Sequence, residues 1–567
     1  MLKLQGIPLR HYSAMFGKIL IVYFAINGVS WLVLVSSAIP IYLNNQQALN
    51  YHEGVISPYL VLSVVLSTVL SAIYLILEKK GAESYLWFYF LLAPFFLVSS
   101  FVIRNVTDPI SLWFIYATAV FIYIVASLLL AKRKESLKKL MFVFGFIGLC
   151  YVLVDLYNWM NSKDIRLTTG TEKISQDFLV TNGFVGKPNI YHFILDEYQS
   201  DMFDLTLSGS SADDLSGFYY FKNTTTLFGR TEMSLASTFL GHSYDFIEDP
   251  IDYQSRAFSS EDSLFYWVRN SGYKISAYIH PVFSFELKNF DNIQYHENLP
   301  SEYNPIFESY FNKLWAYSIT PDFISKRLMS PDEYLKLESQ NLLTAAAPIK
   351  SLRTMQDIIE NEKNLSAEGR YTFVHLILPH FPYVLNADCS FSIEGETSSP
   401  LAQARCANKL MREFIGKLKQ QDRFDSSMII IHSDHGARFV LEDGMLKDVE
   451  HEGLYSERWS LARARSLLLI KPPGRGADTP LITSDADVSL IDIAPSILES
   501  MNIDNSMRMD GRNIVSPPLF KNREERDYYF YDKENYSGSP GIFNITHFRI
   551  KEMEIRKVGI NEFLKVQ

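Results

Sequence analysis

The sequence is poor in cysteine, with three in 567 residues, and none of them has the spacing of a zinc finger. Cys150 lies in an apolar stretch, where we expect a small buried packing residue. Cys389 and Cys406 both lie in the more polar, later part of the chain. A disulfide between them would fit an oxidising compartment, and two separate reduced thiols are the alternative.

Positive charge is also scarce, since 53 Lys and Arg face 63 Asp and Glu and the formal net charge is -10. Nucleic-acid binding needs a basic surface, so we expect no nucleic-acid partner. Ionisable residues are almost absent from the apolar segments before residue 160, and Asp155 stands near the end of the last one. Transporters usually carry such residues at mid-membrane depth, so these segments predict an anchor.

Five apolar segments are long enough to cross a hydrocarbon core of about 30 Å, which takes roughly 20 helical residues. The first is too long, and is followed by too many others, to be a cleaved signal peptide. We therefore expect a transmembrane domain of five helices in residues 1–160. The segments are Ile19–Leu43, Val55–Leu77, Tyr85–Ile103, Leu112–Ala131 and Leu140–Met160.

Basic residues in the short connections predict the orientation, because Lys and Arg gather on the cytoplasmic side. They precede the first segment, occur at Lys79 and Lys80 after the second, and cluster from Lys132 to Lys139 after the fourth. The connection Asn44–Gly54 has none. This pattern puts the N-terminus in the cytoplasm. Five crossings of a bacterial inner membrane then put everything after Met160 in the periplasm or at the outer surface.

The later part of the chain has the composition of a globular protein. We interpret residues 161–187 as a juxtamembrane linker and residues 188–567 as one extracytoplasmic domain. Its short apolar runs suit strands buried on both faces, and helical patterns separate them, which predicts an α/β sandwich. The runs are Asn189–Leu195, Tyr273–Ile279, Tyr371–Leu378, Met428–His432 and Leu467–Ile470, with helices at Ala404–Gln420 and Val488–Met501.

Acidic residues and histidines follow three of these runs. Asp196 and Glu197 follow the first, Asp434 and His435 follow the fourth after one serine, and His380 follows the third. Ligands gather at the carboxyl ends of strands in such sheets, and carboxylate with imidazole suits Zn²⁺ or Mn²⁺. An acidic pair after a strand can instead be a helix N-cap with a first-turn acid. Histidine has no such capping role, so the combination favours a metal site.

At these residues the chain resembles the alkaline phosphatase/sulfatase superfamily. More narrowly, it resembles the membrane-anchored phosphoethanolamine and phosphoglycerol transferases, which include the lipoteichoic acid synthases. The resemblance implies five crossings followed by an α/β sulfatase-like (alkaline phosphatase-like) domain that binds a divalent metal, Zn or Mn. The metal ligands that it implies are Asp196, assisted by Glu197, with Thr231, Asp434 and His435.

The resemblance also implies a nucleophile, because the family has a Thr followed three residues later by a Ser. Thr231 and Ser234 fit that pattern. A helix N-cap is the alternative role for Thr231, and Thr224, Thr225, Thr226 and Ser234 are the alternative nucleophiles. We expect His380 to donate a proton to the leaving group. The expected substrate-binding residues are His451, Arg438 and Ser234.

Two departures from the wider family bear on the reaction. No cysteine lies in the Cys/Ser-x-Pro-x-Arg motif of sulfatases, and no Ser-x-Pro-x-Arg stands near Thr231, so sulfate-ester hydrolysis is not expected. Ala236 stands where the phosphoethanolamine transferases tend to have Pro. The donor head group therefore stays open between ethanolamine, glycerol and another group.

The resemblance implies a transferase that moves a phospholipid head-group phosphate through a phospho-threonine. Its partners would be a membrane phospholipid as donor and a cell-surface glycan or lipid as acceptor. A metal-dependent phosphoester hydrolase is one alternative, and a non-catalytic envelope assembly protein is another. Asp196, Thr231, Asp434 and His435 occur together, which argues against a degenerate scaffold.

Overall fold

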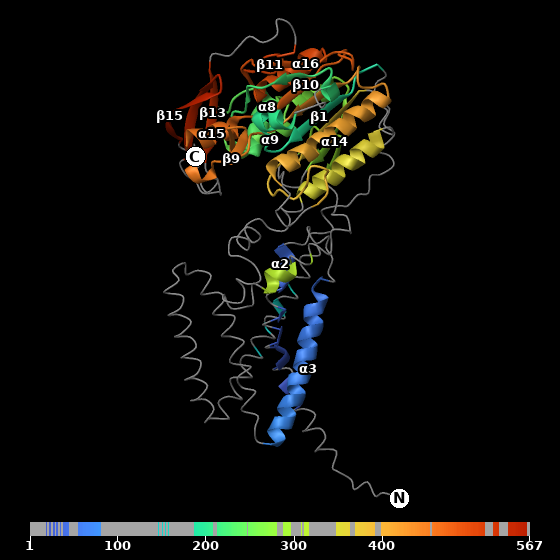
Figure 1. The fold of residues 1–567 in the computed structure, drawn as a ribbon, viewed down its shortest axis with the longest axis vertical. Helices are drawn as coiled ribbons and strands as arrows, with labels where there is room; N and C mark the ends of the chain where they lie inside the picture. Colours follow the sequence, from blue (N-terminus) through green and yellow to red (C-terminus); the bar gives the residue numbers. More distant parts are fainter. Residues whose placement is uncertain are drawn as a thin grey trace, which may run out of the picture. The chain divides into compact units, whose positions relative to one another are not determined.

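The structure is a computed structural model in which the chain divides into two compact units (Figure 1). The N-terminal unit comprises residues 1–172 and 298–344, and the C-terminal unit comprises residues 173–297 and 345–567. The structure describes 55–80, 186–207, 213–246, 248–279, 287–295, 347–362, 369–391, 399–453, 456–515, 525–531 and 543–563, with 308, 311–316 and scattered positions in 19–44 and 146–157.

In the described part of the N-terminal unit, one helix is long and apolar enough to cross a membrane. This helix, α3 (Ser57–Lys79), coincides with the second predicted segment, and the short α2 (Ala38–Asn44) lies at the end of the first. The other three predicted segments fall outside the described residues except at isolated positions, so the prediction of five helices is not confirmed. One face of α3 is buried, at Tyr59, Ser63, Ser67, Ser71 and Tyr74. The opposite face exposes large apolar side chains, among them Val61, Val65, Val69 and Ile76.

Residues 298–344 were predicted to belong to the extracytoplasmic domain, but they fold with the N-terminal unit. Aromatic contacts explain this correction, since the Trp315 and Phe311 rings lie 4.4 Å and 5.9 Å from the ring of Tyr59 on α3. The indole N–H of Trp315 donates to the carbonyl of Leu34 at 3.0 Å, and Tyr59 donates to the Asn312 side chain. An insertion between two strands of the C-terminal unit thus packs on the start of α3.

The cysteines are arranged as one bonded pair and one free thiol. Cys389 and Cys406 form a disulfide, as the first of the two alternatives predicted. Cys150 was expected to be buried, but it is exposed. It lies in an apolar stretch of the N-terminal unit. Apolar residues are found on protein surfaces as well as in interiors, so the apolar stretch did not by itself predict burial.

The C-terminal unit is built on an eight-stranded sheet. Its strands are β1 (Ile190–Leu195), β2 (Tyr219–Phe221), β4 (Lys274–Ile279), β5 (Asn292–Tyr295), β6 (Arg370–Leu376), β7 (Met428–His432), β10 (Leu468–Lys471) and β11 (Ile482–Ser484). They lie in the order β11-β2-β10-β7-β1-β6-β4-β5. β1 runs parallel to β6 and β7, whereas β10 is antiparallel to both of its neighbours. β1, β6 and β7 therefore end at the same edge of the sheet.

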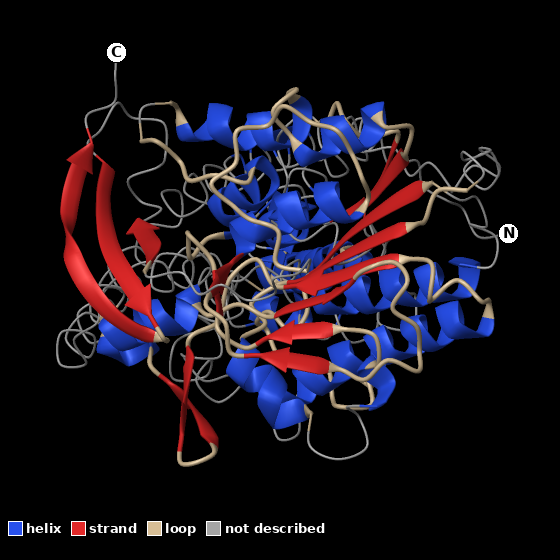
Figure 2. Ribbon diagram, turned by 90° about the horizontal axis from the view of Figure 1, so that it is seen from above, coloured by secondary structure: helices blue, strands red, loops and turns tan. Residues whose placement is uncertain are grey.

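Helices cover both faces of this sheet, as Figure 2 shows. They are α7 (Ser200–Thr206), α8 (Thr231–Leu240), α9 (Pro250–Ser259), α10 (Leu264–Asn270), α14 (Pro400–Gln420), α15 (Glu457–Ala464) and α16 (Ile493–Ser500), with 3-10 turns η4 (Asp213–Leu215), η7 (Glu450–Glu452) and η8 (Leu490–Asp492). The central strands β1, β6 and β7 are buried along their whole length, which explains their continuous apolar runs. The predicted sandwich of strands and helices is confirmed.

Smaller sheets surround the main one. The strands β3 (Thr224–Thr225) and β12 (Val488–Ser489) pair with each other, as do β8 (Phe439–Glu442) and β9 (Met445–Asp448). A C-terminal sheet contains β13 (Arg526–Tyr531), β14 (Phe543–Lys551) and β15 (Glu554–Phe563). Its Tyr528 and Phe530 share a buried cluster with Trp459 of α15. β13 also touches the chain just before α8, since the Tyr529 N–H donates to the Leu227 carbonyl at 2.8 Å.

Candidate active site

Three side chains converge where β1 and β7 end. Asp196 directly follows β1, and Asp434 and His435 follow β7 after Ser433. One ligand atom from each of the three lies within 4.8 Å of the others, and all three residues are buried. The structure thus brings together the three side chains that the strand ends predicted.

The donor atoms of this cluster suit a cation. The His435 Nδ1–H donates to the Gly436 carbonyl at 3.0 Å, which leaves Nε2 with a lone pair. That lone pair faces Asp434 Oδ2 at 3.0 Å, and among the described residues Asp434 Oδ2 and Asp196 Oδ1 are buried without a hydrogen-bond partner. Acceptors this close repel one another unless a positive charge lies between them. Two carboxylates and an imidazole are a fitting ligand set for Zn²⁺ or Mn²⁺.

The pKa shifts of Asp434 and His435 also indicate that the cluster suits a cation. Burial raises the pKa of Asp434, and the negative charge of Asp196 raises it further. Burial lowers the pKa of His435 to about 4, and the nearby Arg463 adds to this effect. The imidazole is therefore neutral at pH 7, as a metal ligand must be. A bound cation would relieve the cost of holding the two carboxylates together.

Thr231 lies beside the cluster at the start of α8. Its Oγ1 is 3.3 Å from His435 Nε2, and its hydroxyl partly offsets the effects of burial and of Asp196 that raise the pKa of Asp434. The N-cap position belongs to Arg230, which has extended backbone and no side-chain cap bond. Thr231 is therefore the first helical residue and not the cap. An anion bound at its hydroxyl would meet the positive end of the helix.

The alternative nucleophiles are all inaccessible. Thr224, Thr225, Thr226 and Ser234 have no exposed surface, whereas Thr231 is partly exposed. The Ser234 hydroxyl contacts the Thr226 hydroxyl at 2.7 Å and donates to the Asp434 carbonyl. Ser234 was expected to bind substrate, but in this position it supports the Asp434 loop from inside.

Glu197 was expected to assist in binding the metal, and the structure directs it elsewhere. Its carboxylate pairs with Arg463 of α15, and His380 Nε2 lies 3.7 Å from Oε1. Burial alone would raise the pKa of Glu197, but His380, Arg463 and His435 together lower it to about 2. For His380, burial opposes the charged form, but Glu197, Asp196 and Asp434 outweigh it and raise the pKa. Glu197 is therefore the partner of two basic side chains.

The two remaining predicted residues are not part of this arrangement. Arg438 pairs with Asp448 at 2.9 Å and with Glu450, and its guanidinium lies over the Phe381 ring, 5.4 Å from the centroid. His451 is exposed on η7, and no contact in the described part of the chain joins it to the metal ligands. Through Phe381, Arg438 contacts the loop that carries His380.

Two residues of the site were missed by the sequence analysis. His375 on β6 is fully buried, and its Nε2 contacts Asp196 Oδ2 at 3.1 Å, which orients that ligand from behind. Arg463 Nη2 donates to the Gly229 carbonyl at 2.7 Å and lies 3.4 Å from His435 Nε2. His375 could have been found from the sequence, because it is a histidine inside the apolar run of β6. The sequence offered no comparable signal for Arg463.

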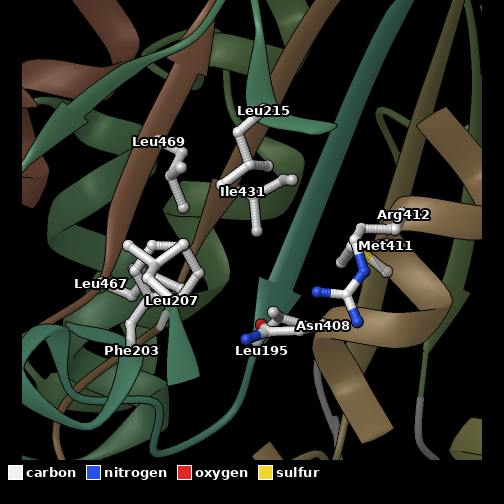
Figure 3. A pocket seen from close by; sticks show the side chains of 10 residues that line it. All are labelled: Leu195, Phe203, Leu207, Leu215, Asn408, Met411, Arg412, Ile431, Leu467 and Leu469. Atoms are coloured by element: carbon white, nitrogen blue, oxygen red, sulfur yellow. The ribbon is translucent and has the colours of Figure 1, made fainter. Parts of the chain in front are cut away.

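A separate pocket lies between the sheet and α14 (Figure 3). Its walls are mainly apolar, and none of the predicted site residues lines it. The lining residues are Leu195, Phe203, Leu207, Leu215, Asn408, Met411, Arg412, Ile431, Leu467 and Leu469. This pocket is therefore distinct from the cluster of Asp196, Asp434 and His435 at the sheet edge.

Comparisons with known proteins place this geometry in a family. The Sulfatase family model matches residues 188–503. Similar solved structures include a phosphonate monoester hydrolase from Silicibacter pomeroyi, with 13% identity, a TM-score of 0.40, and coverage of 65% of this chain and 88% of that chain. The lipoteichoic acid synthase LtaP from Listeria monocytogenes has 14% identity, a TM-score of 0.37, and coverage of 66% and 86%.

The periplasmic domain of EptC from Escherichia coli has 12% identity and a TM-score of 0.37, and the match covers 62% of this chain and 91% of that domain. No curated relative matches the chain. The family model covers more than half of the 567 residues, and the buried side chains of Asp196, Asp434 and His435 lie inside the matched region. The protein therefore belongs to the sulfatase family.

Proposed function

We propose that this protein is a membrane-anchored, divalent-metal-dependent phosphotransferase. Its donor is a phospholipid with a phosphoethanolamine or phosphoglycerol head group, and its acceptor is a cell-surface glycan or lipid. The observation that carries the proposal is the position of Thr231, with its hydroxyl 3.3 Å from His435 Nε2 beside the buried ligands. A hydroxyl in that place is suited to attack phosphorus.

The proposed reaction has two half-reactions. A divalent ion held by Asp196, Asp434 and His435 would lower the pKa of the Thr231 hydroxyl and neutralise charge on the phosphoryl oxygens. Thr231 Oγ1 attacks phosphorus, the bond from phosphorus to the lipid alkoxide breaks, and His380 donates a proton to that alkoxide. The acceptor hydroxyl then attacks the phosphorus of the phospho-threonine and gives its proton to His380, while the bond from phosphorus to Thr231 Oγ1 breaks, so both residues return to their starting states.

Two observations support a membrane-bound enzyme that acts outside the cytoplasm. The exposed apolar face of α3 suits contact with lipid. The disulfide between Cys389 and Cys406 fits an oxidising compartment.

The test uses the full-length, metal-loaded protein in vesicles of phosphatidylethanolamine and phosphatidylglycerol. We expect release of diacylglycerol and a phosphorylated peptide at Thr231 by mass spectrometry. Thr231→Ala should lower diacylglycerol release by at least about a thousandfold, because the nucleophile is gone. Thr483→Ala, the same change at an exposed position on β11, is the control and should release diacylglycerol normally.

The products separate the proposal from its alternatives. Head-group phosphate that appears only on an added glycan or lipid acceptor supports a transferase, and free head-group phosphate without an acceptor supports a hydrolase. Undiminished diacylglycerol release by Thr231→Ala would exclude the proposed mechanism. A wild-type protein that binds neither Zn²⁺ nor Mn²⁺ would support the non-catalytic alternative.

A further inference from the structure

Glu197 has a backbone conformation that is unusual for a residue with a side chain. Its φ is +61°, in the left-handed region that non-glycine residues seldom occupy. Its N–H donates to Asp434 Oδ1 at 3.1 Å, so the strained turn is tied to the metal cluster. Such strain persists where the surrounding structure enforces it, which is common at functional sites. The turn sends the carboxylate of Glu197 away from that of Asp196.

The carboxylate of Glu197 meets Arg463, which joins the loops of the active site. Besides its pair with Glu197, the guanidinium donates to the carbonyl of Gly229, two residues before Thr231. Its Nη2 also lies 3.4 Å from Nε2 of His435. One side chain therefore contacts the loops that carry a metal ligand, the nucleophile and the end of β1.

The glycine that follows His435 allows this arrangement. A Cβ on Gly436 would lie 2.0 Å from the Ala462 carbonyl oxygen and 2.5 Å from that of Arg465. The Gly436 N–H donates to the Arg463 carbonyl at 2.8 Å. The end of α15 is thus held directly against the loop of His435, and the position of Arg463 is fixed from its backbone outward.

The opposite side of Glu197 faces His380. Its Nε2 lies 3.7 Å from Glu197 Oε1, and 31% of its side chain is exposed, compared with 15% for Arg463. Two basic side chains thus share one carboxylate beside a nucleophile, and both remain open enough to meet a ligand. A guanidinium can donate two parallel hydrogen bonds to two oxygens of one phosphate group.

We propose that Arg463 binds the non-bridging oxygens of the phosphoryl group at Thr231, and that Glu197 is a positioning residue that holds Arg463 and His380 and does not bind the metal. This inference rests on the proposed function and deepens it. It assigns to this site an anion subsite for a phosphate monoester or diester. The alternative is a purely structural role, in which Arg463 holds the same loops together and does not contact the phosphoryl group.

The test measures binding as well as turnover, in the full-length, metal-loaded protein. The probe is inorganic phosphate, and its affinity is measured by calorimetry for wild type, Glu197→Gln, Arg463→Gln and Arg463→Ala. Loss of a charge-assisted hydrogen bond should weaken phosphate binding roughly 10- to 100-fold in the Arg463 variants. Glu197→Gln should lower kcat/KM for diacylglycerol release by a similar factor while its bound metal, measured by elemental analysis, stays at the wild-type level.

Arg465→Gln is the matched control. Arg465 stands two residues away and pairs with Asp201, so the same substitution removes an ion pair outside the proposed subsite. It should leave phosphate affinity and turnover unchanged. Guanidinium added to Arg463→Ala should restore part of the lost activity, which a purely structural arginine would not permit.

The outcomes separate this inference from the proposed function. Wild-type phosphate affinity in Arg463→Gln would overturn the subsite, and loss of metal in Glu197→Gln would make Glu197 a ligand and overturn the positioning role. Neither result would alter a requirement for Thr231. An active Thr231→Ala would instead refute the proposed function, and the phosphate-binding measurement would still decide on Arg463.

Discussion

Asp196 and Glu197 are adjacent in sequence, yet their carboxylates lie in opposite electrostatic surroundings. Asp196 joins Asp434 and His435, where two buried carboxylate oxygens have no hydrogen-bond partner within the part of the chain that the structure describes. Glu197 turns away from them and meets Arg463 and His380. The first group, which we call the metal corner, gathers uncompensated negative charge. The second, the basic corner, is compensated by the protein itself.

This difference shows how one strand end can place two carboxylates in unlike electrostatic surroundings. The metal corner holds buried carboxylates together, which costs free energy unless a cation compensates them. The basic corner needs no cation, because each charge has its partner within the protein. The left-handed backbone of Glu197 separates the two corners, although only one peptide bond lies between the residues.

The largest effect is expected from breaking the metal corner. Asp434→Asn removes one of two facing carboxylates, so the metal-free protein should unfold at the same or a higher temperature than wild type. Its metal affinity should fall by more than about a hundredfold, since even outer-shell changes cost 10–100-fold. Calorimetric scans with and without Zn²⁺ or Mn²⁺ measure both effects, because a bound metal raises the unfolding temperature.

The control for this prediction is an aspartate whose charge is compensated. Asp487 pairs with the buried Arg526 at 2.8 Å, so Asp487→Asn removes the charged partner of a buried guanidinium and should cost about 3–5 kcal/mol. It should leave metal affinity unchanged. If Asp434→Asn destabilised the metal-free protein as Asp487→Asn does, the metal corner would not be under electrostatic strain.

A smaller, pH-dependent effect is expected from the basic corner. The pKa of Glu197 is about 2 in the folded protein and near 4.5 in the unfolded chain, so its stabilisation is complete above pH 4.5 and is lost as the pH falls toward 2. Glu197→Gln should therefore cost at most about 3 kcal/mol of unfolding free energy at pH 7. Denaturant titrations from pH 7 to pH 3.5 should show the difference from wild type shrinking below pH 4.5.

The control for Glu197→Gln is a carboxylate in a solvent-exposed ion pair. Glu450 pairs with Arg438 and is 57% exposed, so Glu450→Gln should cost less than about 1 kcal/mol at pH 7. A Glu197→Gln difference that stayed constant or grew as the pH fell to 3.5 would contradict the compensated basic corner.

The sequence predicted the metal corner better than the basic corner, for a physical reason. Parallel strands end at one edge, so residues that follow β1 and β7 must lie together, and Asp196, Asp434 and His435 do. Thr231 needed the family pattern as well. The position of Arg463 depends on the path of the chain from β7 through α15 to β10, which runs antiparallel to β7. No local sequence pattern predicts that path.

The fold was predictable to a similar degree. The five predicted strands correspond to β1, β4, β6, β7 and β10, because buried strands have continuous apolar runs. The predicted helix at Val488–Met501 contains a short strand and a 3-10 turn before α16 begins at Ile493. The packing of Phe311 and Trp315 on α3 was not predictable, because aromatic residues fit a soluble core equally well.

The smallest effect is expected behind the basic corner, at Tyr528 of the C-terminal sheet. Its hydroxyl is buried and has no hydrogen-bond partner in the described part of the chain, so Tyr528→Phe should change the unfolding free energy by no more than about 1 kcal/mol, toward greater stability. The hydroxyl nevertheless fills the space beside Gly229. A Cβ there would lie 2.2 Å from the Tyr528 oxygen and 3.3 Å from Cζ.

The pair of positions gives the decisive comparison. Gly229→Ala alone must shift the chain two residues before Thr231, so it should lower turnover. Adding Tyr528→Phe removes the closer atom and leaves a tight but tolerable contact, so the double variant should recover activity relative to Gly229→Ala. Kinetics and denaturant unfolding of the two single variants and the double variant measure this coupling. A destabilised Tyr528→Phe would mean that the hydroxyl serves the basic corner through an interaction. A double variant no better than Gly229→Ala would mean that the hydroxyl is not what excludes a Cβ at Gly229.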